Sequence, residues 1–388
     1  MRVGIDARTL SGPYTGDRTY WRGLLAGLGA VDRENEYVLY VRKPIEGEPP
    51  PGLGPNFRWR TLPTPEADTL WMLRGFPEAL REDHIDIAHT QYNIPLLGSP
   101  CPVVTTVHDV TFALFPDLFL PRDRWVLNGL VPRSMRRAAR VIADSECTRR
   151  DILRLYRPRI PPEKVTTILL AADSRFRPPP GGQESARRAS NSRYDLGGRP
   201  YVLAVGVLQP RKNLALLLDA FALIKLGPTA PPHRLVIAGK RGWKNDELDR
   251  HLEALPDEVR QEIVFTGYVP DGDLPMLYGG ADALCFPSRY EGFGLPPLEA
   301  LACGCPVLCS RTSSLPEVVG DAGLLLPPDD SSAWANALDK LLSSETVRER
   351  WRERGPGRAA LFSWEKTARE TLRVYEEVVG DRTSVTRH

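Results

Sequence analysis

The stretch "ADALCFPSRYEGFGLPPLEALACGCPVLCS", residues 281–310, holds two short apolar runs separated by a glycine-rich loop and a helical pattern. The runs at 283–286 and 306–309 are continuously apolar, which is typical of strands buried on both faces of a parallel sheet. Between them, the paired prolines suit the first turn of a helix and Gly304 suits its C-terminal cap. The stretch therefore predicts a strand–helix–strand unit with a glycine-rich loop at the exit of the first strand.

The same alternation of strands and helices continues outward on both sides of this unit. The predicted strands are 2–6, 37–42, 86–89, 103–107, 141–143 and 165–169 in a first series, and 201–205, 234–238, 263–266, 283–286, 306–309 and 323–326 in a second. Two such series predict an α/β protein with two Rossmann-like, doubly wound domains. Ligands bind such sheets beyond the C-terminal ends of the strands. We therefore expect the chemistry at strand exits, in the cleft between the domains.

The domain boundaries follow from composition. Residues 1–175 form the predicted N-terminal domain, and 200–362 the C-terminal one. Between them, 176–199 is rich in Pro, Gly, Ser and Arg without periodicity, which predicts a linker or exposed loop. The segment 363–388 opens with a helical pattern that we expect to pack back on the N-terminal domain.

Composition excludes several classes of protein. The 388 residues are 42% hydrophobic and 26% charged, with a net charge of +2, so charge gives no sign of nucleic-acid binding. No apolar run reaches the roughly 18 residues of a membrane span, and no signal-peptide pattern opens the chain, so we expect a cytoplasmic protein. The six cysteines are expected to be reduced and buried, because Cys303-Gly-Cys305 lacks the spacing of a zinc site.

The loop at 291–296 presents glycine-rich backbone amides at a helix N-terminus, which is an anion site by geometry. Glu291 lies in the loop and Glu299 about one turn into the helix, so the two cannot act as a close acid/base pair unless the loop folds back. We expect each to bind hydroxyl groups of one polar ligand. The structural alternative is that Glu291 caps the loop and Glu299 is a solvated helix residue.

Further candidates follow other strand exits. Arg211 and Lys212 offer a planar fork and a point charge, the pair that a phosphate favours, although two solvated cations at a helix start are the alternative. His108 ends a strong apolar strand and is followed by Asp109; it could bind a sugar or phosphate, or be a structural histidine. His89 is a similar strand-exit residue. Asp271-Gly272-Asp273 has the form of a metal-binding pair, but the helix start after it favours a capping turn, so no metal site is predicted.

At "EGFGLP" (291–296) with Glu299, the sequence resembles the family 4 glycosyltransferases of the GT-B fold, the group 1 glycosyl transferases. Further matching stretches are "GVLQPRKNL", "VFTGYVPDGDLPMLYGGADALCFPS", "LEALACGCPVLCS" and "LPEVVGDAGLLLPPDD" in the second domain, and "GIDARTLSGPYTGDRTYW", "TVHDVTFALFPD" and "ADSECTRRDIL" in the first. The resemblance covers nearly the whole chain and is most specific in the second domain.

The resemblance implies a retaining, metal-independent transfer of a sugar from a nucleotide-diphosphate donor to an acceptor hydroxyl, without a cofactor. Arg211 and Lys212 would bind the diphosphate, Glu299 the ribose, and His108 the sugar near its anomeric centre or 6-hydroxyl. The remaining donor-binding residues would be Glu291, Gly292, Phe293, Gly294 and Leu295 at the sugar and β-phosphate, and Tyr268 and Val269 at the base. Of these, His108, Glu291, Arg211 and Lys212 are the catalytic candidates.

The N-terminal loop departs from the pattern Thr-Gly-Ile-Gly-Arg-Tyr of the most similar subgroup, because it reads Thr15-Gly16-Asp17-Arg18-Thr19-Tyr20. Gly16 would let the backbone approach the diphosphate. Asp17 and Arg18 should point to the acceptor or to each other, and His89 joins them as an acceptor-side candidate.

The expected partners are GDP-mannose or a UDP-hexose as donor and a glycan or lipid-linked acceptor, in polysaccharide or glycolipid synthesis. The basic stretches "PRDRW" and "VPRSMRRAAR" are either a solvated helix face or a peripheral contact with the inner face of an anionic membrane. A non-catalytic sugar-nucleotide-binding protein and a sugar-nucleotide epimerase stay open as alternatives. A phosphorylase of this fold would need a lysine for pyridoxal phosphate, and no such motif is found. The oligomeric state is left open.

Overall fold

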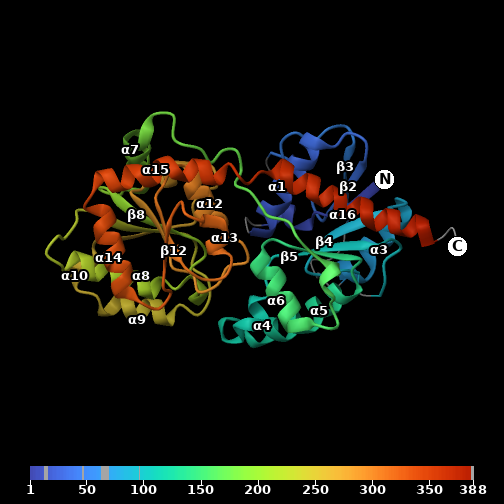
Figure 1. Ribbon diagram of the computed structural model, residues 1–388, viewed down its shortest axis with the longest axis horizontal. Helices are drawn as coiled ribbons and strands as arrows, with labels where there is room; N and C mark the ends of the chain where they lie inside the picture. The colour runs from blue at the N-terminus through green and yellow to red at the C-terminus, as the bar shows by residue number, and fades with distance from the viewer. Residues whose placement is uncertain (13–15, 46–47, 63–69, 96, 386–388) are drawn as a thin grey trace. The chain divides into compact units, whose positions relative to one another are not determined.

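The computed structural model describes residues 1–12, 16–45, 48–62, 70–95 and 97–385, and the chain divides into two compact units (Figure 1). The first unit is Met1–Ala171 together with the C-terminal segment that begins at Ser363; the second is Ala172–Phe362. Each is built on a sheet of parallel strands connected through helices. The predicted α/β class with two Rossmann-like domains is confirmed.

The sheet of the first unit contains seven parallel strands among the described residues. In spatial order they are β3 (Phe57–Thr61), β2 (Glu36–Val41), β1 (Arg2–Asp6), β4 (Ile87–Gln91), β5 (Val103–Val107), β6 (Arg140–Ala143) and β7 (Val165–Thr167). The helices of this unit are α1 (Gly16–Val31), α3 (Phe76–Glu82), α4 (Thr111–Leu114), α5 (Pro121–Arg137), α6 (Glu146–Tyr156) and α16 (Trp364–Val385). Short helical turns are η1 (Arg8–Ser11), η2 (Trp71–Gly75), η3 (Pro116–Leu118) and η4 (Pro162–Lys164).

The sheet of the second unit has six parallel strands. In spatial order these are β10 (Ile263–Gly267), β9 (Arg234–Ala238), β8 (Tyr201–Val205), β11 (Ala283–Phe286), β12 (Val307–Ser310) and β13 (Leu324–Leu326) within the described part of the chain. Its helices are α7 (Gly182–Tyr194), η5 (Pro210–Lys212), α8 (Leu214–Lys225), α9 (Asp246–Ala254), α10 (Asp257–Arg260), α11 (Leu274–Gly280), α12 (Leu295–Ala302), α13 (Leu315–Val319), α14 (Ser331–Leu342) and α15 (Glu345–Ala359).

Burial on both faces explains why the strands of the second sheet are continuously apolar. Along β8, Val202 and Ala204 belong to the hydrophobic cluster that includes α8 and α14. Tyr201 and Leu203, which point the other way, belong to the cluster that includes α11 and α12. A strand covered on both faces needs an apolar residue at every position.

Strand β3 is not among the predicted strands. It forms the edge of the first sheet and is mostly exposed, so its sequence mixes aromatic and basic residues. Arg58 and Arg60 on this strand both bond the carboxylate of Asp83, at 2.6 Å each. An edge strand that is held by ion pairs lacks the apolar run by which buried strands are recognised.

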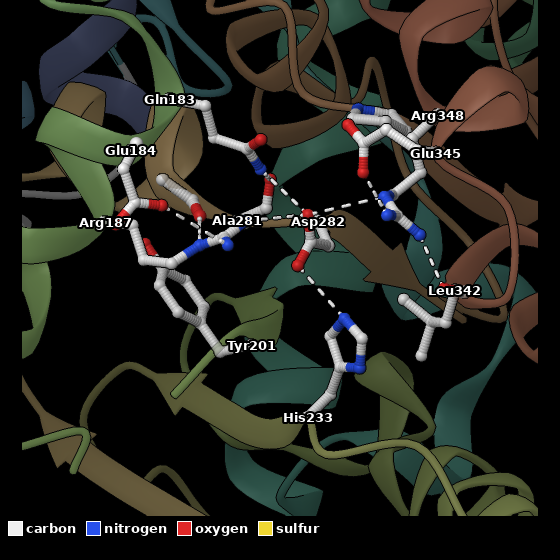
Figure 2. A network of polar contacts seen from close by, with 12 residues as sticks. Gln183, Glu184, Arg187, Tyr201, His233, Ala281, Asp282, Leu342, Glu345 and Arg348 are labelled. Atoms are coloured by element: carbon white, nitrogen blue, oxygen red, sulfur yellow. Dashed lines mark hydrogen bonds and ion pairs between the residues drawn. The ribbon is translucent and has the colours of Figure 1, made fainter. Parts of the chain in front are cut away.

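The predicted linker at 176–199 is wrong over Gly182–Tyr194, which form α7 and pack against α11. The helix is anchored by Asp282, a buried carboxylate just before β11 (Figure 2). Gln183 and Arg187 of α7 donate to its Oδ1 at 2.9 and 2.8 Å. Because polar bonds hold α7, its sequence shows no apolar periodicity. The helix belongs to the second unit.

Asp282 also receives bonds from two other directions. His233 Nε2 lies 3.0 Å from its Oδ2, and Arg352 of α15 donates to its Oδ1 at 3.0 Å. Nε of Arg348, on the same helix, lies 3.6 Å from Asp282 Oδ1 (Figure 2). One carboxylate therefore ties α7 and α15 to the start of β11.

The C-terminal helix α16 packs along α1 and belongs to the first unit (Figure 1). Two glycines of α1 make this close approach possible: a Cβ on Gly23 would lie 2.0 Å from the ring of Trp364, and one on Gly27 would lie 2.2 Å from the carbonyl oxygen of Trp364. None of the described helices combines the length and the apolar character that a membrane span requires. All six cysteines are buried free thiols.

Candidate active site

The glycine-rich loop between β11 and α12 is held by the segment that follows β12. The amide of Glu291 donates to Ser313 Oγ at 2.9 Å. Ser314 Oγ lies 2.9 Å from the carbonyl oxygen of Glu291 and 2.6 Å from that of Phe293. Gly294, with φ of +110°, adopts a backbone conformation that other residues rarely reach, and α12 begins at the next residue. The two serines thus fix the loop at the N-terminus of α12.

Arg211 and Lys212 lie in the turn η5, at the exit of β8, and converge on Glu291. Arg211 Nη1 is 2.6 Å from Glu291 Oε2, and Lys212 Nζ is 2.7 Å from Oε1. The two loops are also joined through the backbone, since the amide of Arg289 donates to the carbonyl of Arg211 at 2.9 Å. The site therefore holds two cations and one carboxylate, a net charge of +1, beside a helix N-terminus that carries partial positive charge.

This cluster is fixed by its surroundings. Lys212 Nζ lies 4.5 Å from the centre of the Phe286 ring. A Cβ on Gly206 would come within 3.1 Å of Lys212 Cε, so glycine leaves room for the side chain to cross. Burial by itself would raise the pKa of Glu291, but the charges of Arg211 and Lys212 outweigh it and lower that pKa to about 2. Glu291 is therefore ionised at neutral pH.

Glu299 lies on α12 and is 8% exposed. Tyr278 of α11 donates its hydroxyl proton to Glu299 Oε2 at 3.0 Å. Burial raises the pKa of Glu299 to about 7, against the effect of this hydrogen bond. The carboxyl therefore keeps its proton to a higher pH than an exposed glutamate does, and the hydrogen bond from Tyr278 fixes its orientation.

In the first unit, His108 follows β5 and contacts two carboxylates. Its Nδ1 lies 2.5 Å from Asp144 Oδ2, and its Nε2 lies 3.7 Å from Asp17 Oδ1 in the first turn of α1. Burial would lower the pKa of His108, but the Asp144 carboxylate outweighs it, with Asp17 and Asp109 acting in the same direction, and raises the pKa to about 9.

Comparison with known proteins assigns the chain to a family. A family model for glycosyl transferases group 1 matches residues 187–358, and one for glycosyltransferase family 4 matches 19–175. An O-antigen chain mannosyltransferase B from Escherichia coli is 37% identical over 274 residues, which cover 70% of this chain and 70% of that protein. The chain belongs to the group 1 glycosyltransferases.

Two further relatives of this glycosyltransferase are similar over smaller shares of their own length. A D-inositol 3-phosphate glycosyltransferase from Corynebacterium jeikeium (strain K411) is 38% identical over 202 residues, covering 50% of this chain and 48% of that protein. A serotype-specific mannosyltransferase WbdA from Escherichia coli is 29% identical over 281 residues, covering 71% of this chain and 33% of that protein. This chain thus matches only about a third of WbdA.

Solved structures share the fold at lower identity. A sucrose-phosphate synthase from Thermosynechococcus elongatus matches with a TM-score of 0.75 and 23% identity, over 98% of this chain and 99% of that one. WaaG, a glycosyltransferase involved in lipopolysaccharide biosynthesis, matches with a TM-score of 0.70 and 17% identity, over 96% and 99%. These likenesses place the glycosyltransferase in the GT-B fold class.

The structure places the other predicted donor-site residues of the glycosyltransferase as follows. Tyr268 follows β10 and is 52% exposed, whereas the Val269 side chain packs in the hydrophobic core. Leu295 opens α12, and Gly292 lies in the loop before it. Gly16 opens α1, and a Cβ there would meet nothing within 4 Å, so packing alone does not require a glycine at this position.

The structure places the acceptor-side candidates Asp17, Arg18 and His89 in different surroundings. Asp17 faces His108, as described above. The guanidinium of Arg18 is buried and donates to the carbonyl of Gly12 at 2.6 Å, so it is directed back into its own loop. The placement of His89 on the acceptor side is wrong. Its side chain is fully buried, with Nδ1 2.5 Å from the Tyr375 hydroxyl and Nε2 2.8 Å from Thr106 Oγ1.

Four residues that shape the site are not among the predicted ones: Asp144, Tyr278, Ser313 and Ser314. Three of them carry a usable signal, because Asp144 follows one strand and the serine pair follows another, and strand exits are where such folds bind ligands. Tyr278 carries none, since a tyrosine on an apolar helix is normally a core residue.

Proposed function

We propose that this glycosyltransferase moves a hexose from a nucleotide-diphosphate sugar to an acceptor hydroxyl, with retention of anomeric configuration and without a metal ion. Mannose from GDP-mannose is the first candidate, and a UDP-hexose the second. The mannosyltransferase relatives support mannose. O-antigen synthesis, named in one of those relatives, supports a polysaccharide or lipid-linked glycan as acceptor.

The observation that carries this proposal is the convergence of Arg211 and Lys212 on Glu291 beside the first turn of α12. Negative charge grows on the departing diphosphate as the sugar–oxygen bond breaks. Fixed cations and oriented backbone amides stabilise that charge without having to reorganise. Two cations in this position supply the charge that a divalent ion supplies elsewhere, which favours a metal-independent transfer.

The state of Glu291 favours a route without a covalent glycosyl–enzyme intermediate. Each of its carboxylate oxygens is engaged by a cation, at 2.6 and 2.7 Å. A carboxylate held in this way is a poor nucleophile but a good acceptor for sugar hydroxyl groups. We assign Glu291 to sugar binding, and we assign the acceptor's proton to the leaving phosphate.

Glu299 would bind the ribose hydroxyls. It lies on the helix whose N-terminus carries the loop, and Tyr278 fixes one of its oxygens, so the other oxygen is available to a ligand. Tyr268, exposed at the exit of β10, would border the base.

A peripheral membrane contact is supported by the first part of α5. Trp125 is 81% exposed and Val126 is 39% exposed, and Arg122 and Arg124 beside them are exposed as well. Tryptophan next to arginine is typical of a surface that enters an anionic lipid interface. Sedimentation with phosphatidylglycerol vesicles, compared with phosphatidylcholine vesicles, tests it, and Trp125→Ala should weaken the binding.

The transfer itself is tested in two steps. A thermal-shift screen of nucleotides and sugar nucleotides should give a rise in melting temperature for one base and one sugar. The selected donor is then assayed with acceptor, with and without EDTA, and the anomer of the product is determined. Activity lost in EDTA and restored by Mg²⁺ would reject metal independence. Binding without transfer would favour the non-catalytic alternative, and a changed sugar in the released nucleotide would favour an epimerase.

A further inference from the structure

His108 and Asp144 are brought together by the register of two neighbouring strands. Val107 at the end of β5 is paired with Ala143 at the end of β6. The next residue on each strand is His108 and Asp144, so their side chains emerge side by side, and Nδ1 lies 2.5 Å from Oδ2. Asp144 is 2% exposed, which places this contact inside the protein.

The segment that holds Asp144 also holds the backbone of His108. Ser145, the next residue, caps α6 through the amide of Thr148 at 3.0 Å. Thr148 Oγ1 in turn donates to the carbonyl of His108 at 3.2 Å. The ring and the main chain of His108 are therefore fixed from the same neighbouring segment.

The other groups around the ring leave Asp144 as its dominant partner. Asp17 reaches only to 3.7 Å from Nε2, and Asp109 is the next residue in the chain. Tyr20 and Tyr92 lie edge-on to the ring at 5.0 and 5.4 Å, and burial raises the pKa of both hydroxyls well above its usual value, so neither is charged. His89 is neutral as well, because burial lowers its pKa to about 3.

The second ring nitrogen of His108 is left without a hydrogen bond. Nε2 is buried and has no hydrogen-bond partner among the residues that the structure describes. A buried donor without an acceptor costs free energy, of the order of 1–3 kcal/mol. The Asp17 carboxylate, 3.7 Å away, lies beyond hydrogen-bond distance, so an oxygen of a bound ligand would complete the bonding of this nitrogen.

We propose that Asp144 is a positioning residue for the transfer reaction: it fixes the imidazole of His108 so that the Nε2–H is presented to an oxygen of a bound sugar substrate. The inference rests on the proposed function, because it needs a sugar substrate at His108. With Nδ1–H donated to Asp144, the second proton on Nε2 makes the ring a cation and a stronger donor. The Asp17 carboxylate also favours the charged form of the ring. Because it lies 3.7 Å from Nε2, it leaves the Nε2–H to donate to the ligand.

The test compares the full-length chain with Asp144→Asn, Asp17→Asn and, as a matched control, Glu163→Gln, which removes an exposed carboxylate of the same unit. NMR titration should give His108 a pKa near 9 in the wild type, a value close to the ordinary 6.5 in Asp144→Asn, a smaller decrease in Asp17→Asn and none in the control. Because the reaction needs the charged ring, kcat/KM for the donor should fall above this pKa. The pH at which kcat/KM falls should therefore be lower by about one pH unit or more in Asp144→Asn. Asp144→Glu should reverse part of this shift.

A falling limb that stays in place in Asp144→Asn, while the pKa of His108 drops, overturns the proposal. If Asp144→Asn does not fold, the wild-type Nδ1–H resonance decides: a slowly exchanging, far-downfield signal supports the contact, and its absence rejects it. A wild-type chain that transfers no sugar from any donor is a failure of the proposed function, which is distinct from an unmoved pH profile in an active enzyme.

Discussion

Lys212 Nζ lies 2.7 Å from Glu291 Oε1, although the two residues are 79 positions apart in the chain. Each follows a different strand, β8 and β11, and these strands are neighbours in one parallel sheet. Parallel strands place their exits at the same edge, so a cation from one loop meets a carboxylate from the next. The donor site proposed here is built on that meeting.

Removing the lysine should impair transfer far more than folding. Of the two cations described above that contact Glu291, Lys212→Ala leaves Arg211. The substitution also removes a positive charge that would face the leaving diphosphate. We expect kcat/KM for the donor to fall roughly 100-fold or more. Lys340→Ala, on the exposed side of α14, is the matched control and should keep wild-type kinetics. Turnover of Lys212→Ala close to that of the control would remove Lys212 from the site.

The loop glycine should be intolerant of even one added methyl group. At Gly294 a Cβ would lie 2.8 Å from Leu315 Cδ2, on a backbone with φ of +110°. Gly294→Ala should lower the free energy of unfolding by about 1–3 kcal/mol and weaken nucleotide binding, because the amides before α12 move. Gly357→Ala on α15, where a Cβ meets nothing within 4 Å, should be neutral or stabilising. Equal effects of both changes in chemical denaturation would contradict this account of the loop.

Glu299 should make stability depend on pH. Its pKa is raised from 4.5 to about 7, so between these values the folded chain keeps a proton that the unfolded chain has lost. The contribution of this group to the free energy of unfolding therefore falls as pH rises through that window. Glu299→Gln removes the effect, and its stability relative to wild type should be about 1–3 kcal/mol more favourable at pH 8 than at pH 5. Urea unfolding of both proteins at the two pH values measures this; a difference independent of pH would contradict it.

Asp282 should be essential to the second unit. Burial would raise its pKa, but the hydrogen bond from His233 and the charge of Arg187 outweigh it and lower the pKa to about 2. Its contribution to stability is thus present above the unfolded pKa near 3.8 and is lost as pH falls toward 2. Asp282→Asn leaves the partly buried Arg187, Arg348 and Arg352 poorly paired and should cost about 3–5 kcal/mol at neutral pH in guanidinium unfolding. Asp321→Asn, at an exposed aspartate, is the control; a similar small loss in both would refute the role of Asp282.

The sequence predicted best what depends on apolar burial. Strand 201–205 is predicted with the bounds that the structure gives, because both of its faces are packed. It failed where polar bonds hold an element: α7 is anchored on Asp282, and β3 on Asp83. Partners so distant in sequence leave no local pattern to detect.

The candidate site divides in the same way. Arg211, Lys212 and Glu291 were predicted from loops at strand exits, and the structure brings them together. His89 was expected at a strand exit, but β4 runs on to Gln91, so His89 lies inside the strand with its ring against Tyr375 of α16. The strand continues through the polar residues Thr90 and Gln91, which an apolar run does not reveal.

The most direct test of the central claim is the affinity of the protein for nucleoside diphosphates relative to monophosphates. Calorimetric titration compares GDP with GMP, and UDP with UMP, in the wild type, Lys212→Ala and Lys340→Ala. We predict that the wild type and the control bind the diphosphate of the preferred base about tenfold or more tightly than its monophosphate. In Lys212→Ala this preference should largely disappear while monophosphate binding persists. An undiminished diphosphate preference in Lys212→Ala would contradict the account.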